Sequence, residues 1–115
     1  NGAVSGIDRL HTALHGYLRA ICSNAGINFS PDDPIARLLK LIRKQHPAFQ
    51  NLGSRGQDIE RVYQSFGAVL DAVNSIRNNA SLAHANENLL EVDEAYLVIN
   101  AVNTILHYLE AKLRK

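Results

Sequence analysis

The segment from Ser75 to His84 holds side chains that can bind an anion and transfer a proton. The Arg77 guanidinium can hold a phosphate through two parallel hydrogen bonds. The His84 imidazole titrates near neutral pH, so it can act as a base or as an acid. The Asn78 amide can orient the phosphate or the histidine. These three residues, Arg77, Asn78 and His84, are therefore the candidate catalytic residues of the chain.

A long amphipathic helix must position Arg77. Apolar residues recur at helical spacing before it, at Val62, Phe66, Val69, Val73 and Ile76. Asn78 and Asn79 compete for backbone groups, so we expect the helix to fray or stop between them and His84. An unbroken helix would place Arg77 and His84 about 10 Å apart along its axis. Either a break after Asn78 folds His84 toward Arg77, or a two-fold dimer brings two copies of the segment together.

The other apolar residues also recur at helical spacing and do not alternate over any long window, as strands require. The sequence therefore predicts an all-α fold, an antiparallel bundle of four main helices near residues 5–24, 34–45, 57–78 and 92–113. The predicted core contains Leu14, Leu38, Phe66, Val73 and Val102. The last helix has an unusually wide apolar side, which indicates a place at the centre of the bundle or at a two-fold dimer interface.

Single residues predict where the helices end. We expect Gly26 to stop the first helix. Asp33 is expected to cap the second helix, with the following proline at the first helical position, and Asp93 to cap the fourth. Residues 48–56 are rich in glycine and amide side chains and are expected to form a loop. Gly67, inside the third helix, indicates the close approach of a neighbouring helix.

The second predicted helix carries four cations, and no acidic residue occurs from residue 34 to residue 57. The four are Arg37, Lys40, Arg43 and Lys44. One interpretation is an ordinary solvated face. The other is a rim that binds RNA, because cations at this density bind phosphates without reading the base sequence.

The first helix offers one further group of polar side chains. Asp8, His11 and His15 share a flank at spacings of three and four residues, which is compatible with a metal site. No other ligand cluster supports such a site, so we expect a solvated or interface-lining flank and no metal or other cofactor. The single Cys22 lies beside the apolar stripe and is expected to pack rather than to react.

Length and composition predict an ordinary globular protein. The 115 residues, of which 46% are hydrophobic, suffice for a single domain spanning 1–115. A formal net charge of +1 produces no global field for nucleic acid, so any basic surface must be local. No apolar run approaches the roughly 18 residues of a membrane span, and no signal peptide is present, so we expect a cytoplasmic protein without a membrane partner. Because the chain begins with Asn1, we expect it to be the C-terminal part of a longer protein.

The order of these features resembles the HEPN ribonucleases. Arg77-Asn78, with six residues separating Arg77 from His84, stands between the last two long helices, as the catalytic motif of that superfamily does. The closest resemblance is to the C-terminal domain of abortive-infection proteins, in which an Ala-His or similar pair precedes a helix rich in alanine and aliphatic residues. Ala83-His84, followed by the segment 95–102, repeats that order. Such domains often carry glycine after the histidine, whereas Ala85 follows here.

The resemblance implies a metal-independent endoribonuclease, a toxin or antiphage effector of abortive infection, with an Arg-Asn…His site at a homodimer interface. In such a reaction the 2′-OH of RNA attacks the adjacent phosphate, which requires a base, an acid and positive charge. His84 would transfer protons, Arg77 would stabilise the growing charge, and Asn78 would orient one of them. The expected partners are RNA and a second copy of the chain, with an N-terminal domain or an antitoxin as further candidates.

Two other interpretations of the segment remain open. A helix-end arginine and a loop histidine are often surface or capping residues, and the domain would then be a non-catalytic dimerisation or regulatory module of a larger defence protein. A metal-dependent enzyme is the third interpretation.

Overall fold

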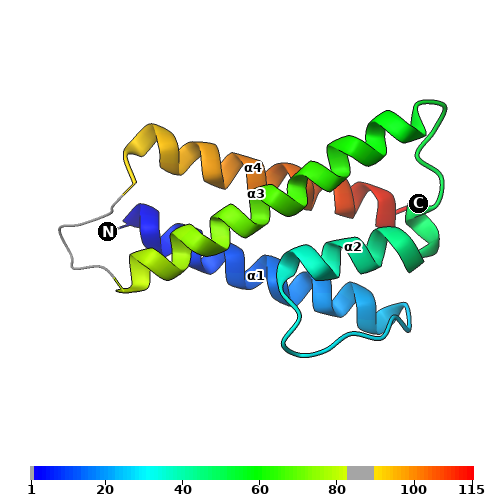
Figure 1. Ribbon diagram of the computed structural model, residues 1–115, viewed down its shortest axis with the longest axis horizontal. Helices are drawn as coiled ribbons and strands as arrows, with labels where there is room; N and C mark the ends of the chain where they lie inside the picture. The colour runs from blue at the N-terminus through cyan, green and yellow to red at the C-terminus, as the bar shows by residue number, and fades with distance from the viewer. Residues whose placement is uncertain (1, 83–89) are drawn as a thin grey trace.

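The computed structural model describes the backbone of residues 2–82 and 90–115 and the side chains of residues 6–76 and 90–115. The helices are α1 (Gly2–Asn24), α2 (Ile35–Gln45), the short 3-10 helix η1 (Pro47–Phe49), α3 (Gly56–Leu82) and α4 (Val92–Leu113). Figure 1 shows an elongated bundle in which α3 runs opposite to the other three α-helices. Neither described range contains a strand, so the predicted all-α bundle of four main helices is confirmed.

Gly26 ends α1 as predicted. Its φ of +71° lies in the left-handed region that glycine adopts without steric cost. The Ile27 amide then donates a 2.9 Å hydrogen bond back to the carbonyl of Cys22, which satisfies one of the free carbonyls at the helix end. The chain turns away from α1 at this point and returns along it before α2 begins (Figure 1).

The cap predicted at Asp33 is wrong. Pro34 occupies the cap position of α2 with extended backbone angles, and no side chain caps the helix. The Asp33 carboxylate instead accepts a 2.9 Å hydrogen bond from the Ser30 amide, and the Asp33 carbonyl accepts one of 3.0 Å from His15 Nε2. Asp33 therefore fastens the connecting loop to α1 rather than beginning α2.

The cap predicted at Asp93 is also wrong. Glu91 occupies the cap position of α4 without a side-chain hydrogen bond, and Asp93 lies with Glu94 in the first helical turn. Carboxylates in a first turn still stabilise a helix, because they face the positive end of its dipole. Asp93 therefore does mark the start of α4, but it acts on the helix dipole from the first turn and does not cap the helix.

The predicted core is confirmed at four of its five residues. Leu14, Leu38, Val73 and Val102 are each at most 2% exposed. Phe66 is only half-buried and packs against the edge of the core. Cys22 is fully buried, as its place beside the apolar stripe predicted.

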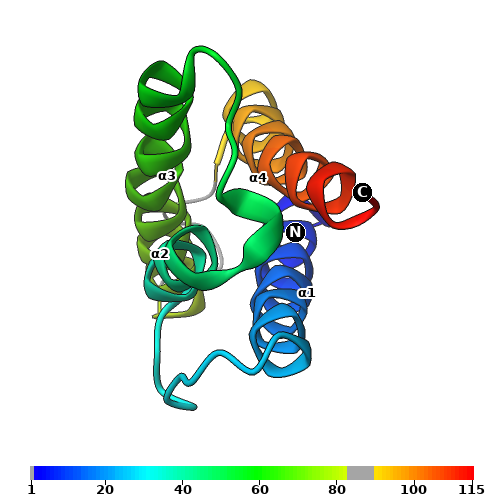
Figure 2. The same ribbon diagram turned by 90° about the vertical axis from the view of Figure 1, so that its right-hand side faces the viewer.

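An aromatic cluster closes one end of the bundle. Phe49, in η1, is fully buried, and its ring centroid lies 5.6 Å from that of His46, 6.3 Å from that of Tyr63 and 6.2 Å from that of Tyr108. The Tyr63 hydroxyl donates a 2.6 Å hydrogen bond to the carbonyl of Leu39, which joins α3 to α2. Figure 2 shows η1 crossing this end of the bundle. The segment predicted as a plain loop thus begins with a turn that contributes to the core.

Gly67 does not serve the close helix packing that the sequence predicted. A Cβ atom built on Gly67 would meet no other atom within 4 Å. A glycine inside a helix costs about 1 kcal/mol relative to alanine. Packing within the fold therefore gives no reason for glycine at this position.

The apolar side predicted for the last helix is buried or half-buried from Ala95 to Leu113, but three other apolar residues at the start of α4 are exposed. Val92, Tyr96 and Leu97 in its first turns are 67%, 60% and 69% exposed. On the predicted apolar side, Ala95, Val102, Ile105 and Leu109 are buried by the described bundle. The exposed apolar cluster of Val92, Tyr96 and Leu97 therefore lies just after the connection between α3 and α4.

Candidate functional site

Arg77 and Asn78 lie on the last turns of α3, with helical backbone. Their side chains and the whole of His84 lie outside the described residues. α3 ends at Leu82, between the two asparagines and His84 as expected, but four residues beyond the predicted bound of 78. Asparagine disfavours a helix by less than about 0.7 kcal/mol, which is too little to end a helix of this length. Both arrangements considered for the site, the folding of His84 toward Arg77 and the two-fold dimer, stay predictions, because His84 lies outside the described residues.

Three of the four cations of α2 are exposed. Arg37, Lys40 and Lys44 lie on the outer side of the helix, whose inner side is fully buried. Lys40 and Lys44 stand one helical turn apart, about 6 Å along the axis, so their ammonium groups can act on neighbouring anionic groups. This exposure is compatible with both interpretations of the basic helix.

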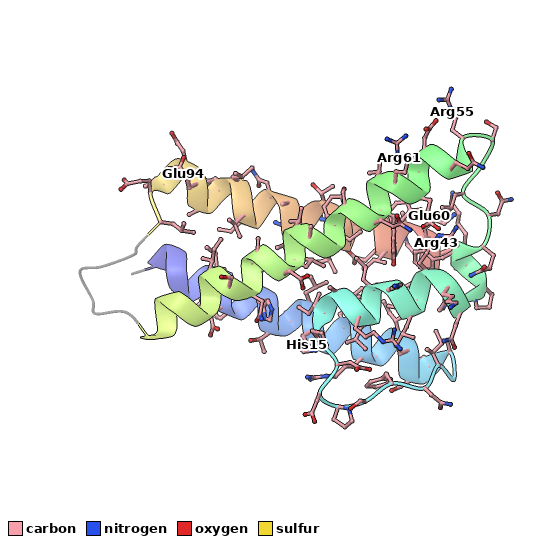
Figure 3. All side chains as sticks on the ribbon, viewed as in Figure 1. His15, Arg43, Arg55, Glu60, Arg61 and Glu94 are labelled. Carbon is pink, nitrogen blue, oxygen red and sulfur yellow. The ribbon has the colours of Figure 1, made fainter. Side chains whose placement is uncertain are left out.

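Arg43 differs from the other three, because its guanidinium is held by the fold. Its Nε donates to Glu60 Oε2 at 2.9 Å, and its Nη1 donates to the Phe49 carbonyl at 2.9 Å. The Arg43 side chain is only 23% exposed. Figure 3 shows Arg43 and Glu60 pointing toward one another from α2 and α3, whereas Arg55 and Arg61 point outward. Arg43 thus joins α2, η1 and α3.

Gln50 completes this junction. Its side-chain amide donates to the Arg43 carbonyl at 3.0 Å and to the His46 carbonyl at 2.8 Å, both of which lie at the end of α2. Free carbonyls at a helix end need such partners or water. The end of α2 is therefore fixed by side chains from two other segments.

A groove of about 760 Å³ runs between α2 and α3. Its lining residues on α2 include Ala36, Lys40 and Lys44, and those on α3 include Gln64, Gly67 and Asp71. Tyr63, Leu39 and the Arg43–Glu60 pair also border it. The groove therefore places two ammonium groups on one wall and an amide and a carboxylate on the other.

The flank of α1 that carries Asp8, His11 and His15 gives no metal site. Among the described residues, no group of three or more His, Cys, Asp or Glu side chains is placed to hold a metal ion. His11 is only 5% exposed, and its ring centroid lies 6.1 Å from that of His15 in an edge-on arrangement. The predicted solvated flank is thus wrong for His11, which packs inside the bundle.

Burial raises the pKa of two groups whose chemistry could otherwise matter. Burial, reinforced by nearby Tyr108, raises the pKa of the Tyr63 hydroxyl well above its ordinary value, although Arg43 acts in the opposite direction. Burial, with a smaller effect of Asp33, also raises the pKa of the Cys22 thiol. Both groups stay protonated at neutral pH, so neither provides a nucleophile.

Sequence reasoning missed the partners of the basic helix. Glu60 gave no sign of its role, because its contact with Arg43 joins residues 17 positions apart. Gln64, Gly67 and Asp71 did give a signal, since spacings of three and four residues put them on one face of α3. None of these three positions carries a large apolar residue, which indicates that this face of α3 does not pack against another helix.

Comparison with known proteins identifies the family. The chain matches the Abi_C family, a HEPN-like domain, over residues 2–113. Because the match covers nearly the whole chain, the protein belongs to this family, and the resemblance found in the sequence is confirmed. Neither the curated proteins nor the solved structures gave a match. None of the described helices is long and apolar enough to cross a membrane.

Proposed function

We propose that this protein is a metal-independent endoribonuclease that acts in abortive infection. The observation that carries the proposal is the family match over residues 2–113. It supports the assignment of Arg77, Asn78 and His84, which was made from the motif of that superfamily. The position of Arg77 and Asn78 at the end of α3, ahead of α4, agrees with that motif.

The three side chains divide the reaction between them. The 2′-OH of the RNA attacks the adjacent phosphate, and His84 takes its proton or supplies one to the leaving 5′ oxygen. Arg77 holds the phosphate through its guanidinium fork and stabilises the negative charge that grows on the phosphorane. Asn78 orients the phosphate or the imidazole. The products carry a 2′,3′-cyclic phosphate on one fragment and a free 5′-OH on the other.

A two-fold dimer supplies the second imidazole, because one histidine cannot be base and acid at the same moment. The exposed apolar cluster of Val92, Tyr96 and Leu97 supports this arrangement, since it directly follows the segment that must meet its copy. Burying such side chains is worth about 1.5–3 kcal/mol each, so a shared interface is the favourable place for them. The dimer also makes the site depend on protein concentration.

The exposed cations of α2 provide the general RNA-binding surface. Arg37, Lys40 and Lys44 bind phosphates, whereas Arg43 mainly holds the fold together, because Glu60 and the Phe49 carbonyl already engage its guanidinium. Binding by such cations weakens as salt rises, since phosphate neutralisation releases counterions.

The proposal is tested by incubating the purified protein with transfer RNA and messenger RNA in excess EDTA. We expect cleavage by the wild-type protein and a loss of about 10²–10⁴ in rate for His84→Ala, which removes proton transfer. Arg77→Lys should recover only part of the activity lost in Arg77→Ala, because an ammonium lacks the bidentate fork. Full activity of a folded His84→Ala protein would overturn the assignment.

A second candidate is a non-catalytic dimerisation module of a larger defence protein. The observation that favours it is the same exposed apolar cluster, which needs a partner whether or not the protein cuts RNA. A wild-type protein that dimerises but leaves RNA intact under all conditions, with and without EDTA, would select this alternative.

A further inference from the structure

Three described helical glycines, Gly6, Gly16 and Gly67, have no atom within 4 Å of an added Cβ, and of these only Gly67 lines the groove between α2 and α3. Gly67 lies in the middle of α3, where glycine is unfavourable, and no neighbour would touch a Cβ atom placed there. It also lines the groove between α2 and α3, with Gln64 on one side and Asp71 on the other. A glycine that packing does not need, in the wall of a groove, indicates that the empty space beside it is used.

The charges of the groove define what can occupy it. Lys40 and Lys44 on α2 attract an anionic group such as a phosphate. Across from them, Gln64 can both donate and accept hydrogen bonds, while the Asp71 carboxylate only accepts them. A second anion facing Asp71 would be repelled, so hydrogen-bond donors, such as the N–H groups of a base, suit the other end of the ligand. A phosphate joined to a group with N–H donors is the chemistry of a nucleotide.

We propose that the groove holds one unpaired nucleotide of the RNA strand, with its phosphate at Lys40 and Lys44 and its base beside Gly67, where the base edge faces either Gln64 or Asp71. The absence of a side chain on Gly67 leaves room for the base. The volume of about 760 Å³ falls within the range of roughly 300–1,000 Å³ usual for small-ligand sites. The inference rests on the proposed function and deepens it, because it assigns single-stranded RNA as the substrate class.

A paired base cannot occupy this site, because its donors are already used by the opposite strand and its edge is buried in a duplex. Proteins read RNA bases mainly in single-stranded loops and ends, where base edges and faces are free. A duplex would offer the two lysines only its backbone. The groove therefore selects unpaired RNA even though lysines alone do not.

Along α3, the groove lies close to the candidate catalytic segment. Asp71 precedes Arg77 by six residues on the same helix, which is about 9 Å along the axis. The groove acts as a positioning site for the strand and not as part of the reacting centre.

The test compares two helical glycines, of which only Gly67 lines the groove. Gly16, in α1, is exposed, and a Cβ atom on it would also meet nothing within 4 Å. Gly16→Ala and Gly67→Ala should both raise the melting temperature, by about 4 °C each, through helix preference. Only Gly67→Ala should weaken binding of an RNA octamer made uncleavable by full 2′-O-methylation, by about threefold in fluorescence anisotropy. Gly67→Leu should weaken it more than tenfold, and Gly16→Leu should not.

Three ligands identify what the groove binds. The single-stranded octamer should bind more tightly than a blunt duplex of the same sequence, and Gly67→Leu should abolish that difference. Equal binding of strand and duplex, or unchanged binding by Gly67→Leu, would overturn the inference. Adenosine monophosphate that binds as tightly as the octamer would overturn the assignment to a strand.

Because the octamer cannot be cleaved, this result is independent of catalysis. If wild-type protein cuts ordinary RNA while the Gly67 variants bind normally, the nucleotide site fails and the ribonuclease proposal stands. If the groove binds the octamer as described but ordinary RNA is never cut, the ribonuclease proposal fails and the nucleotide site stands.

Discussion

Replacing Arg43 with alanine should destabilise the protein far more than replacing any exposed cation. The change removes the 2.9 Å hydrogen bond to Glu60 and the 2.9 Å hydrogen bond to the Phe49 carbonyl. Hydrogen bonds to charged groups contribute about 1.5–3 kcal/mol each, and the lower end applies because the two side chains are 23% and 31% exposed and partly screened by water. We therefore expect a loss of about 3 kcal/mol in the free energy of unfolding.

Thermal unfolding followed by circular dichroism measures this loss. A chain of 115 residues has an unfolding entropy of about 240 cal/mol/K, so 3 kcal/mol lowers the melting temperature by about 12 °C. Arg55→Ala is the matched control, because Arg55 pairs with Asp58 while remaining 79% exposed, and it should change the free energy of unfolding by less than about 0.5 kcal/mol. A shift for Arg43→Ala as small as that of Arg55→Ala would refute the structural role of Arg43.

The remaining predictions concern Tyr63, the lysines of α2 and the apolar start of α4. Since burial raises the pKa of Tyr63 above its ordinary value near 10, its contribution to stability should be complete below about pH 10 and be lost as the pH rises further. Tyr63→Phe should lower the free energy of unfolding by about 1 kcal/mol at pH 7. The denaturant concentration at the unfolding midpoint should then fall less steeply with rising alkaline pH in the variant than in the wild-type protein. An equally steep fall in both proteins would show that ionisation of Tyr63 does not cause it. Lys40→Glu combined with Lys44→Glu should weaken RNA binding and flatten its salt dependence without changing the melting temperature. An unchanged salt slope would show that the two lysines do not bind RNA and belong to an ordinary solvated face. Tyr96→Glu combined with Leu97→Glu should shift the protein from dimer to monomer in sedimentation at micromolar concentration. A wild-type protein that sediments only as a monomer would contradict the proposed dimer.

The helices were predictable because their apolar residues repeat over several turns. Predicted bounds of 92–113 for the last helix agree with Val92–Leu113, and 34–45 for the second differs from Ile35–Gln45 by one residue. Such a pattern sums many small preferences, so single residues do little to disturb it. For the same reason α3 continues through Asn78 and Asn79 to Leu82, four residues beyond its predicted bound of 78.

Features that depend on one contact between distant segments were not predictable. Nothing near Arg43 in the sequence separates it from Lys40 or Lys44, yet it alone of the three meets Glu60 across the groove. Phe49 follows a proline in a stretch of turn-forming residues, and its burial results from the rings of α3 and α4 that meet it. The cap predicted at Asp33 failed for a local reason, because its carboxylate accepts a hydrogen bond from the Ser30 amide three residues earlier in the same loop.

The two roles of the basic helix therefore separate by residue. Arg43 should affect stability and leave the salt dependence of RNA binding nearly intact, whereas Lys40 and Lys44 should do the opposite. Gly67 gives a third pattern, since its replacement by alanine should raise stability while lowering affinity for unpaired RNA. Measuring stability and binding on the same set of variants distinguishes the three.

The most direct test of the ribonuclease proposal is the chemical nature of the cut ends. A defined RNA is incubated with wild-type protein in excess EDTA, and the 3′ ends of the products are analysed by mass spectrometry. Attack by the 2′-OH, with His84 transferring protons and Arg77 stabilising the charge, predicts 2′,3′-cyclic phosphate ends, and a single 2′-O-methyl group at the cut site should block cleavage there. Products that end in 3′-OH, or cleavage that EDTA abolishes, would contradict the proposed reaction.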